Sequence, residues 1–418
     1  MHINFATASF KDFENIAGMD AFATAAYFGE YLHYLSAQGH LNYRIESRTP
    51  PGPEMDLMLP GHDRPTRAVC LVSNDYLGFS QHPQIRQAVI NGTDQYGTGS
   101  GASPAIGGHF VYHALLEKKI AAFYRRSDAI LFTTGYTANS ATLQCLLHEQ
   151  DLAIIDMAVH ASVYEGCLRT NTKQFLHNNL EHLEQVLSKA KDTYRTKFVI
   201  VDGVYSQDGD IAPLAAIAEV THRYGAYLVV DDAHGIGVVG TTGRGVIEQF
   251  NLFDQVDIIT GTFSKALGNI GGYVIARPDL VDYLKYQAKQ HLFSTTATPA
   301  IMGILRAIEL VDEEPVWREK LWHNINHLKN GLTSMGFDIG TTASAVIPVK
   351  IGNIPKTLEA GKILLAAGIY ANPIMYPAVS KKNARIRMNV MATHKIEHLD
   401  SVLNAFADAN RRLQIAGI

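Results

Sequence analysis

Cysteines, long apolar runs and targeting signals are scarce in this 418-residue chain, and each scarcity excludes a class of protein. The three cysteines, Cys70, Cys145 and Cys167, form no Cys-x-x-Cys motif and cannot all be paired, which favours a reducing compartment. No uninterrupted apolar stretch approaches the ~20 residues that a membrane span requires. The N-terminus MHINFATASFKDFENIAG carries Asp12 and Glu14 and lacks the basic start and apolar run of a secretory signal. We therefore expect a cytoplasmic protein.

The chain also lacks a surplus of basic residues. Its formal net charge is −4, and the charges are interspersed, whereas nucleic-acid binding needs a basic face. Its 18 histidines include no His-Glu-x-x-His motif, so we predict no metal site. GTGSGAS at residues 97–103 looks like a dinucleotide-binding loop, but it follows a helical pattern and not a strand. The aromatic N-terminal segment has no Lys/Arg-rich face, so membrane contact is not indicated.

The apolar pattern divides the chain into three predicted parts. Residues 1–67 hold an aromatic helical pattern (AFATAAYFGEYLHYLSAQ) followed by a linker or turns in TPPGPEMDLMLPGHDRP. In residues 68–300, short apolar runs such as FVIVD and AYLVVD alternate with amphipathic helical segments. This alternation is typical of a mostly parallel sheet covered by helices on both faces. Residues 301–418 mix helical segments with strand-like AVIPVKIG and RIRMNVMA, which predicts a smaller C-terminal α+β domain.

Polar residues follow five of the predicted strands at the point where each strand ends. The segments are TTGYTAN, DMAVHASVYEG, DGVYSQDGD, DDAHG and GTFSKALG. In an open α/β sheet, ligands bind outside the carboxyl ends of the strands, so these residues should meet at one edge.

These residue types are the ones that pyridoxal-5'-phosphate (PLP) chemistry needs. A lysine must form an imine with the cofactor aldehyde, and a carboxylate must keep the pyridine nitrogen protonated. Lys265 lies in a Gly-rich turn after an apolar strand, and Asp231 ends another strand. His160 and His234 lie in equivalent turns and could contact the ring. Residues 134–136 begin a helix whose backbone amides could hold the phosphate.

The order of these motifs resembles the α-oxoamine synthase family. The likeness runs from SNDYLGF at residue 73 to MATH ending at residue 394, through TGYTAN, HASVYEG, DGVYSQDGDIAPL, VDDAHGIGVVG and GTFSKALGNIGGY. The resemblance implies a fold-type-I PLP-dependent transferase, similar in fold to aspartate aminotransferase. Within the family, HNN, NPIMYPAV and RMNVMATH are most similar to the bacterial serine palmitoyltransferases.

The resemblance also implies a role for each site residue. Lys265 is the Schiff-base lysine and the base that transfers a proton, and Asp231 pairs with the pyridine nitrogen. His160 is expected to stack on the cofactor ring, His234 to contact the ring oxygen, and Ser206 to lie beside the ring. Thr262 and the amides of Gly135 and Tyr136 are expected to bind the phosphate, and Arg387 and Asn74 the substrate carboxylate. Thr295 or Thr296, with Thr296 preferred, is expected to reach the partner subunit's phosphate.

The implied reaction is a decarboxylative condensation of an amino acid with an acyl thioester. Serine and a long-chain acyl group are favoured, which gives a 3-keto aminolipid precursor. A cysteate acyltransferase that starts sulfonolipid synthesis is the alternative, followed by synthases that use alanine or glycine. The acyl group arrives on coenzyme A or on acyl carrier protein, and the resemblance implies a homodimer with shared active sites. Another PLP reaction, such as transamination, would keep the same lysine and aspartate.

One segment departs from the family pattern. The family has a Gly-Ser-Arg run followed by Gly-Thr where this chain has GASPAIGGH, so Pro104 replaces the arginine and His109 replaces the threonine. This segment borders the substrate channel in relatives, so the departure bears on the choice of amino acid or acyl donor.

Overall fold

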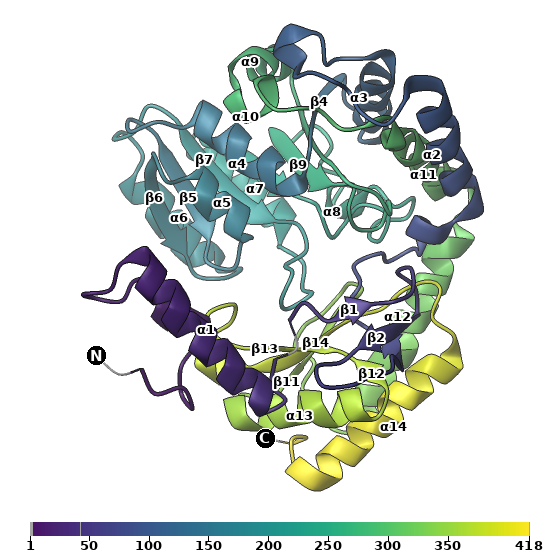
Figure 1. The fold of residues 1–418 in the computed structure, drawn as a ribbon. Coiled ribbons are helices and arrows are strands. Elements are labelled where there is room, and N and C mark those ends of the chain that lie inside the picture. The colour runs from purple at the N-terminus through teal and green to yellow at the C-terminus, as the bar shows by residue number, and fades with distance from the viewer. Residues whose placement is uncertain (1–2, 42, 418) are drawn as a thin grey trace.

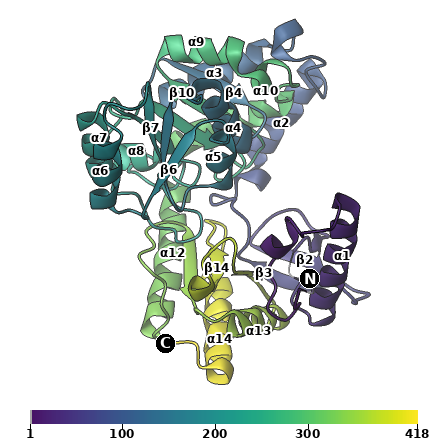
Figure 2. The ribbon, with the colours of Figure 1, turned by 90° about the vertical axis from the view of Figure 1, so that its left-hand side faces the viewer.

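The computed structural model describes residues 3–41 and 43–417. Within these residues the strands form three sheets, of seven, four and three strands. The seven-stranded sheet and its helices form one part of the molecule, and the two smaller sheets lie with the C-terminal helices in the other part (Figures 1 and 2). The predicted architecture, a large and mostly parallel sheet with a smaller α+β part, is confirmed.

The large sheet has the strand order β4-β10-β9-β8-β7-β5-β6. Strand β10 is antiparallel to both of its neighbours, and the other strand pairs in this sheet are parallel. Strands β5, β7 and β10 are buried along their whole length, as expected for apolar strands with helices on both faces. The strands are β4 (Asp128–Phe132), β5 (Leu152–Asp156), β6 (Asn171–Phe175), β7 (Lys197–Asp202), β8 (Tyr227–Asp231), β9 (Ile258–Thr262) and β10 (Gly272–Ala276).

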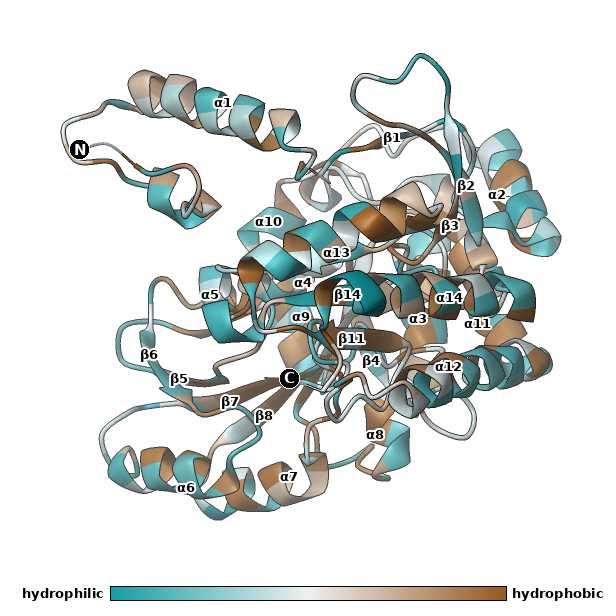
Figure 3. Ribbon diagram, turned by 90° about the horizontal axis from the view of Figure 1, so that it is seen from below, coloured by the Kyte–Doolittle hydropathy of each residue, from teal (hydrophilic) through white to brown (hydrophobic). Residues whose placement is uncertain are grey.

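Helices alternate with these strands along the chain. Figure 3 shows α6 and α7 beside strands β5, β7 and β8, with apolar bands in the helices and mostly apolar strands. The helices of this part are α2 (Pro83–Tyr96), α3 (Val111–Phe123), α4 (Gly135–Leu146), α5 (Ala161–Gly166), α6 (Leu180–Lys189), α7 (Leu214–Arg223), α8 (Gly245–Gln249), α9 (Pro278–Gln287), α10 (Lys289–Leu292) and α11 (Met302–Glu313). Residues 97–103 follow helix α2, so the dinucleotide-loop interpretation fails here too.

The C-terminal part contains both smaller sheets. The three-stranded sheet is β11 (Val346–Lys350), β14 (Arg385–Asn389) and β13 (Asn372–Ile374), so the strands expected in AVIPVKIG and RIRMNVMA are confirmed. The four-stranded sheet is β1 (Glu46–Ser47), β2 (Glu54–Met58), β3 (Thr66–Cys70) and β12 (Ile369–Tyr370). Helices α12 (Val316–Ser334), α13 (Ile354–Ala366) and α14 (Ile396–Leu413) complete this part.

The prediction of a linker or turns in residues 49–65 is partly wrong, because β2 lies inside this segment. Leu57 of that strand is fully buried, so a short apolar pair in a Pro-rich segment was enough to form a strand. The predicted boundaries at residues 67/68 and 300/301 stay a prediction. Strand β3 spans the first boundary and pairs in parallel with β12, which ties the N-terminal segment to the C-terminal part.

The N-terminal helix forms as predicted, but over a shorter range, α1 (Ala21–Ala37), preceded by the 3₁₀ helix η1 (Phe10–Phe13). Phe13, Ile16 and Tyr31 are the buried centre of an aromatic cluster that joins the two helices. In Figure 3 this segment lies at the margin of the molecule. None of the described helices combines the length and the apolar character that crossing a bilayer requires.

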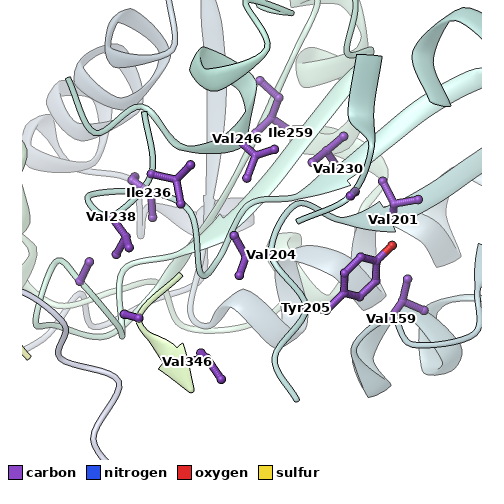
Figure 4. Close-up of a cluster of buried hydrophobic side chains, with 14 of the residues drawn as sticks. Val159, Val201, Val204, Tyr205, Val230, Ile236, Val238, Val246, Ile259 and Val346 are labelled. Carbon is purple, nitrogen blue, oxygen red and sulfur yellow. The ribbon is translucent and has the colours of Figure 1, made fainter. Parts of the chain in front are cut away.

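The apolar core extends directly beneath the carboxyl edge of the large sheet. Figure 4 shows Val201, Val230 and Ile259 of three adjacent strands near Val204 and Tyr205, and Val346 of β11 lies close to this group. These side chains are buried, and such close-packed interiors resist deformation. The loops at this edge therefore rest on a rigid base.

Candidate active site

A cavity of about 230 Å³ opens at the carboxyl edge of the large sheet. Residues from five strand ends line it, as the sequence pattern predicts. Seven of the predicted site residues are among them: Gly135, Tyr136, His160, Asp231, His234, Thr262 and Lys265. The other lining residues are Thr134, Asn139, Asp202, Val204, Ala233 and Ser264.

Lys265 lies three residues after the end of β9, in the turn that leads to β10. Desolvation lowers the pKa of Lys265 to about 8, although the charges of Asp231 and Asp202 oppose this shift and that of Arg387 adds to it. At neutral pH a much larger fraction of this amine is unprotonated than of an ordinary lysine. An amine of this kind can attack an aldehyde and can act as a base.

Asp231 ends β8, and its carboxylate is held from two sides. Oδ1 accepts a hydrogen bond of 3.0 Å from the backbone N–H of Ala233, and Oδ2 accepts one of 2.6 Å from Nδ2 of Asn139. Asn139 also donates to Oγ of Ser162 at 3.0 Å and accepts from the Thr260 hydroxyl at 2.5 Å. Both oxygens of this buried carboxylate are therefore fixed in direction.

His160 precedes helix α5 and borders the same cavity. Its Nδ1 lies 2.8 Å from Oγ of Ser162 and accepts the Ser162 backbone N–H at 3.3 Å. The ring of Tyr136 meets it edge-on at 5.8 Å. Desolvation lowers the pKa of His160, Asp231 opposes this shift, and Lys265 adds to it. The imidazole is therefore mainly neutral near pH 7 and can lie against an aromatic ring.

His234 is buried and touches a tyrosine that sequence reasoning did not select. The hydroxyl of Tyr76 lies 2.6 Å from Nδ1 of His234 and donates to Oδ1 of Asn74 at 3.2 Å. Burial holds the pKa of His234 well below its usual value, helped by the charges of Lys265 and Arg387. A neutral His234 leaves Nε2 available for a polar ligand atom in the cavity.

Gly135 and Thr262 form a narrow cradle at the start of helix α4. A Cβ atom on Gly135 would lie 2.6 Å from Cβ of Thr262, a separation that real side chains do not reach, so only glycine fits. The hydroxyl of Thr134 caps the helix by accepting the Thr137 N–H at 3.0 Å. The N-terminus of this 12-residue helix faces the cavity with backbone amides, which suits an anion such as a phosphate.

Asp202 is a further cavity residue that was not predicted. It ends β7 and is the strand-pair partner of Asp231. Burial and the charge of Asp231 hold the pKa of Asp202 well above its usual value. Its Oδ1 accepts the His160 backbone N–H at 3.4 Å. The direction of this shift follows because ionised Asp202 would be a buried charge beside the Asp231 carboxylate.

The two residues expected at the substrate carboxylate, Arg387 and Asn74, contact each other. Nη2 of Arg387, on β14, lies 3.4 Å from Oδ1 of Asn74, and its Nε donates to the backbone carbonyl of Ser206 at 2.5 Å. Asn389, which was not predicted, also donates to Oδ1 of Asn74 at 3.0 Å. The structure therefore joins the three predicted residues, although none of them lines the cavity around Lys265.

Thr295 and Thr296 line a separate, neighbouring cavity. The hydroxyl of Thr296 donates to the backbone carbonyl of Gly108 at 2.7 Å. Within the described residues of one chain, the structure does not bring either threonine into the cavity that holds Lys265. Their expected contact with a partner subunit's phosphate is not tested by a single chain.

His109 also borders this second cavity, which locates the departure from the family pattern. Its Nε2 lies 3.8 Å from a carboxylate oxygen of Glu117, and its ring stacks on His113 at 5.6 Å. Burial raises the pKa of Glu117 to about 7. Pro104 begins the 3₁₀ helix η3 (Pro104–Ile106) just before it. Among residues 3–41 and 43–417 no group of three or more His, Cys, Asp or Glu side chains could hold a metal ion.

Asn139, Ser162 and Tyr76 are site residues that sequence reasoning missed. All three lie inside motifs that were selected, TGYTAN, HAS and SNDYLG, beside the residues chosen. An asparagine at the end of a motif carries no signal of what its amide contacts. The contact from Asn139 to Asp231 spans 92 positions and exists only in the folded chain.

Comparison with known proteins identifies the family. Residues 66–406 match the model of aminotransferase classes I and II. The chain is 40% identical over 348 residues to the 8-amino-7-oxononanoate synthase of Thermoanaerobacter pseudethanolicus, which covers 82% of this chain and 88% of the relative. An enzyme with the same function in Bacillus subtilis is 38% identical over 84% of this chain and 90% of its own length.

The chain belongs to the α-oxoamine synthase family. It is therefore a PLP-dependent acyltransferase of this type. Solved structures similar to this α-oxoamine synthase include the serine palmitoyltransferase of Sphingomonas wittichii, with 29% identity and a TM-score of 0.89 over 95% of this chain and 100% of that one. A serine palmitoyltransferase of S. paucimobilis with a bound PLP–myriocin aldimine has 28% identity and the same TM-score and coverage.

The residues of this α-oxoamine synthase fit its cofactor. A lysine with lowered pKa can meet the aldehyde, and the fixed carboxylate of Asp231 can meet the pyridine nitrogen. The cradle between Gly135 and Thr262, at a helix N-terminus, can take the phosphate. Each part of PLP thus has a matching group at the cavity.

Proposed function

We propose that this α-oxoamine synthase condenses serine with a long-chain acyl thioester and releases the thiol and CO₂, which yields a 3-keto aminolipid precursor. The observation that carries the proposal is the position of Arg387. It contacts Asn74, and its charge is close enough to lower the pKa of Lys265. A guanidinium here suits the carboxylate of a bound amino acid. The serine palmitoyltransferase structures that match 95% of this chain support serine as first choice.

The proposed contacts are those that the family resemblance implies, and the lining of the cavity supports the ones made by Asp231, His160 and His234. Asp231 faces the pyridine nitrogen, His160 covers the ring, and His234 contacts the ring oxygen. Ser206 stands beside the ring, and Arg387 and Asn74 bind the substrate carboxylate. The phosphate is held by Thr262 and the amides of Gly135 and Tyr136.

PLP, when bound, supplies an acceptor for the electron pair that is left when the amino acid loses its Cα proton. Nζ of Lys265 takes that proton, and its pKa of about 8 suits a base at neutral pH. Arg387 orients the amino acid through its carboxylate, so that the Cα–H bond faces Lys265. Lys265 returns a proton to the product after CO₂ has left.

Asn139 and Ser162 orient two of the residues that are proposed to contact the cofactor, Asp231 and His160. Asn139 fixes the Asp231 oxygen, and the same amide reaches the Ser162 hydroxyl that holds His160. One buried chain of hydrogen bonds therefore sets both the carboxylate and the covering imidazole. Buried networks of this kind keep their groups oriented when every member is satisfied.

The choice of amino acid has specific rivals. The relatives with 37–40% identity are 8-amino-7-oxononanoate synthases, and the methyl-bearing aminoketone end of that product corresponds to alanine. This identity favours an alanine-using synthase as the second candidate, with glycine beside it. Cysteate is the other alternative, because His109, which replaces the family's threonine beside the neighbouring cavity, adds a ring N–H donor that suits a sulfonate oxygen. Coenzyme A and acyl carrier protein are both candidate acyl carriers.

We also propose a homodimer in which Thr296, or Thr295, of each subunit reaches the phosphate of its partner. Large apolar side chains are exposed on the elements around these threonines: Ile106, Val111, Leu168, Tyr286 and Phe293. Exposed apolar surface beside a site is typical of an interface. Light scattering should give twice the monomer mass, and a monomer with full activity would contradict this part.

The test of the reaction begins with the visible absorbance of the PLP-loaded protein. Serine, cysteate, alanine and glycine are titrated separately, and release of ¹⁴CO₂ from carboxyl-labelled amino acid is then measured with palmitoyl coenzyme A. We expect serine to change the absorbance and to release CO₂ only when the thioester is present. If cysteate or alanine releases CO₂ with the thioester and serine does not, that amino acid replaces serine as the substrate. Transamination without CO₂ release would refute the condensation.

Arg387→Lys tests the carboxylate contact in the same assay. Lysine keeps the charge but loses the fork of donors, so the serine KM should rise by roughly tenfold or more. Arg411→Lys, on the exposed face of α14, is the matched control and should leave the KM unchanged. An unchanged KM in Arg387→Lys would contradict the assigned role.

A further inference from the structure

His177 lies between two carboxylates, one at the end of β5 and one in the loop that follows β7. Its Nδ1 is 3.0 Å from Oδ1 of Asp156, and its Nε2 is 2.9 Å from Oδ2 of Asp210. Both ring nitrogens thus face acceptors, which requires the doubly protonated, charged imidazole. The ring edge packs on Tyr205 at 4.4 Å. His177 belongs to the HNN segment, to which the proposed mechanism gives no part.

The Asp156 side of this bridge supports the turn that carries His160. Asp156 ends β5 and is fully buried. Its Oδ1 also accepts the Ala158 N–H at 2.8 Å, and its backbone carbonyl accepts the Val159 N–H at 3.2 Å. These bonds set the path of the backbone in the two residues before His160.

The Asp210 side supports the loop that contacts Arg387. The backbone carbonyl of Asp210 accepts the Tyr205 N–H at 3.0 Å, which closes the loop 203–211. Ser206 lies in this loop, and its carbonyl accepts a hydrogen bond from Nε of Arg387. His177 therefore fixes the base of a loop whose tip holds the proposed carboxylate-binding arginine.

The same loop also contacts the C-terminal part of the molecule. Asp208 forms ion pairs with Arg385 of β14 at 2.8 Å and with Lys350 of β11 at 3.0 Å. The hydroxyl of Ser344 donates to the carbonyl of Gly209 at 2.9 Å. The loop is thus held from both parts of the protein, and His177 provides a charged contact from the large sheet.

We propose that His177 is a positioning residue that couples the amino-acid-binding loop 203–211 to the turn carrying His160. The proposal rests on the proposed roles of Arg387 and His160. A charged imidazole between two carboxylates holds both loops at once, whereas a neutral side chain can bond each only weakly. Although burial opposes the shift, Asp156 and Asp210 raise the pKa of His177 to about 10, so the bridge persists at neutral pH.

The test compares His177→Gln with wild type in the PLP-loaded protein. The amino-acid dissociation constant is measured from the change in visible absorbance, and backbone hydrogen exchange is followed in residues 203–211. We expect the dissociation constant to rise by roughly tenfold and exchange in this loop to accelerate. His327→Gln is the matched control: it removes an exposed His–Asp pair of 2.7 Å between α12 and α14, and it should change neither reading.

Two further variants separate the arms of the bridge. Asp210→Asn leaves the Asp156 contact, so it should weaken amino-acid binding as His177→Gln does and remain measurable if His177→Gln fails to fold. His177→Gln combined with Asp210→Asn should add little to the effect of His177→Gln, because the single variant has already lost the contact between His177 and Asp210. A His177→Gln protein with lowered thermal stability but normal amino-acid binding and loop exchange would overturn the proposal. Failure of the proposed function would instead appear in wild type, as no absorbance change with any amino acid.

Discussion

Nδ2 of Asn139 donates a hydrogen bond of 2.6 Å to the carboxylate of Asp231, and the same amide group reaches the Ser162 hydroxyl. Its carbonyl oxygen accepts from Thr260, so every polar atom of this buried amide is used. A fully used amide has one orientation, and it passes that orientation to the carboxylate. The orientation of the Asp231 carboxylate therefore depends on helix α4, through Asn139, as well as on strand β8.

Asn139→Leu should reduce kcat by roughly 10- to 100-fold, because it leaves one oxygen of a buried carboxylate without its donor. The visible absorbance of the loaded protein should shift as well, since the proposed contact of Asp231 with the cofactor nitrogen would change. Ser140→Ala, the neighbouring position on α4, is the control and should behave as wild type. Unchanged kcat and absorbance in Asn139→Leu would show that Asp231 needs no such support.

Gly135→Ala should weaken PLP binding by at least roughly tenfold. The added Cβ would stand 2.6 Å from Cβ of Thr262, so the start of α4 must move away from the cavity. Equilibrium dialysis against PLP measures the change. Gly29→Ala, on α1, is the control because its Cβ meets no atom within 4 Å, and its affinity for PLP should equal that of wild type. Equal affinities for all three proteins would exclude a phosphate cradle at this helix.

The rate at which PLP attaches to the unloaded protein should follow the unprotonated fraction of Lys265. Because desolvation lowers the pKa to about 8, the rate should rise about tenfold per pH unit below pH 8 and level off above it. An ordinary lysine would level off only near 10.5. Stopped-flow absorbance between pH 6 and pH 10 gives the curve, and Lys265→Ala should show no attachment. A rate that still rises about tenfold per pH unit up to pH 10 would contradict the desolvated environment.

The melting temperature of Glu117→Gln relative to wild type should be higher at pH 8 than at pH 4.5. Burial raises the folded-state pKa of Glu117 to about 7, above its usual 4.5, so its contribution is fully present below pH 4.5 and is lost as pH rises through 7. Glutamine carries no such charge. The difference in melting temperature between the two proteins should grow in favour of the variant from pH 4.5 to pH 7 and then stay constant. A difference independent of pH would mean that the pKa of Glu117 in the folded protein equals its ordinary value of 4.5.

Seven of the residues that line the cavity around Lys265 could be predicted from the sequence, because they directly follow predicted strands. Lys265, Asp231 and His160 each follow an apolar run, and the topology of a parallel sheet brings such positions to one edge. Thr296 shows the limit of this reasoning. Its hydroxyl bonds Gly108 within its own chain, and no strand-end rule describes what a second subunit brings to a site.

The sequence by itself determined the fold class, the cofactor and the positions that line the cavity, because apolar periodicity and motif order are local properties of the chain. Only the tertiary structure decided which contacts orient the side chains at those positions. Asn139 reaches Asp231 and Arg387 reaches Ser206 across 92 and 181 positions, and β2 forms within a segment that predicts turns. Such contacts depend on how separate elements pack, and packing is fixed only when the whole core closes around them.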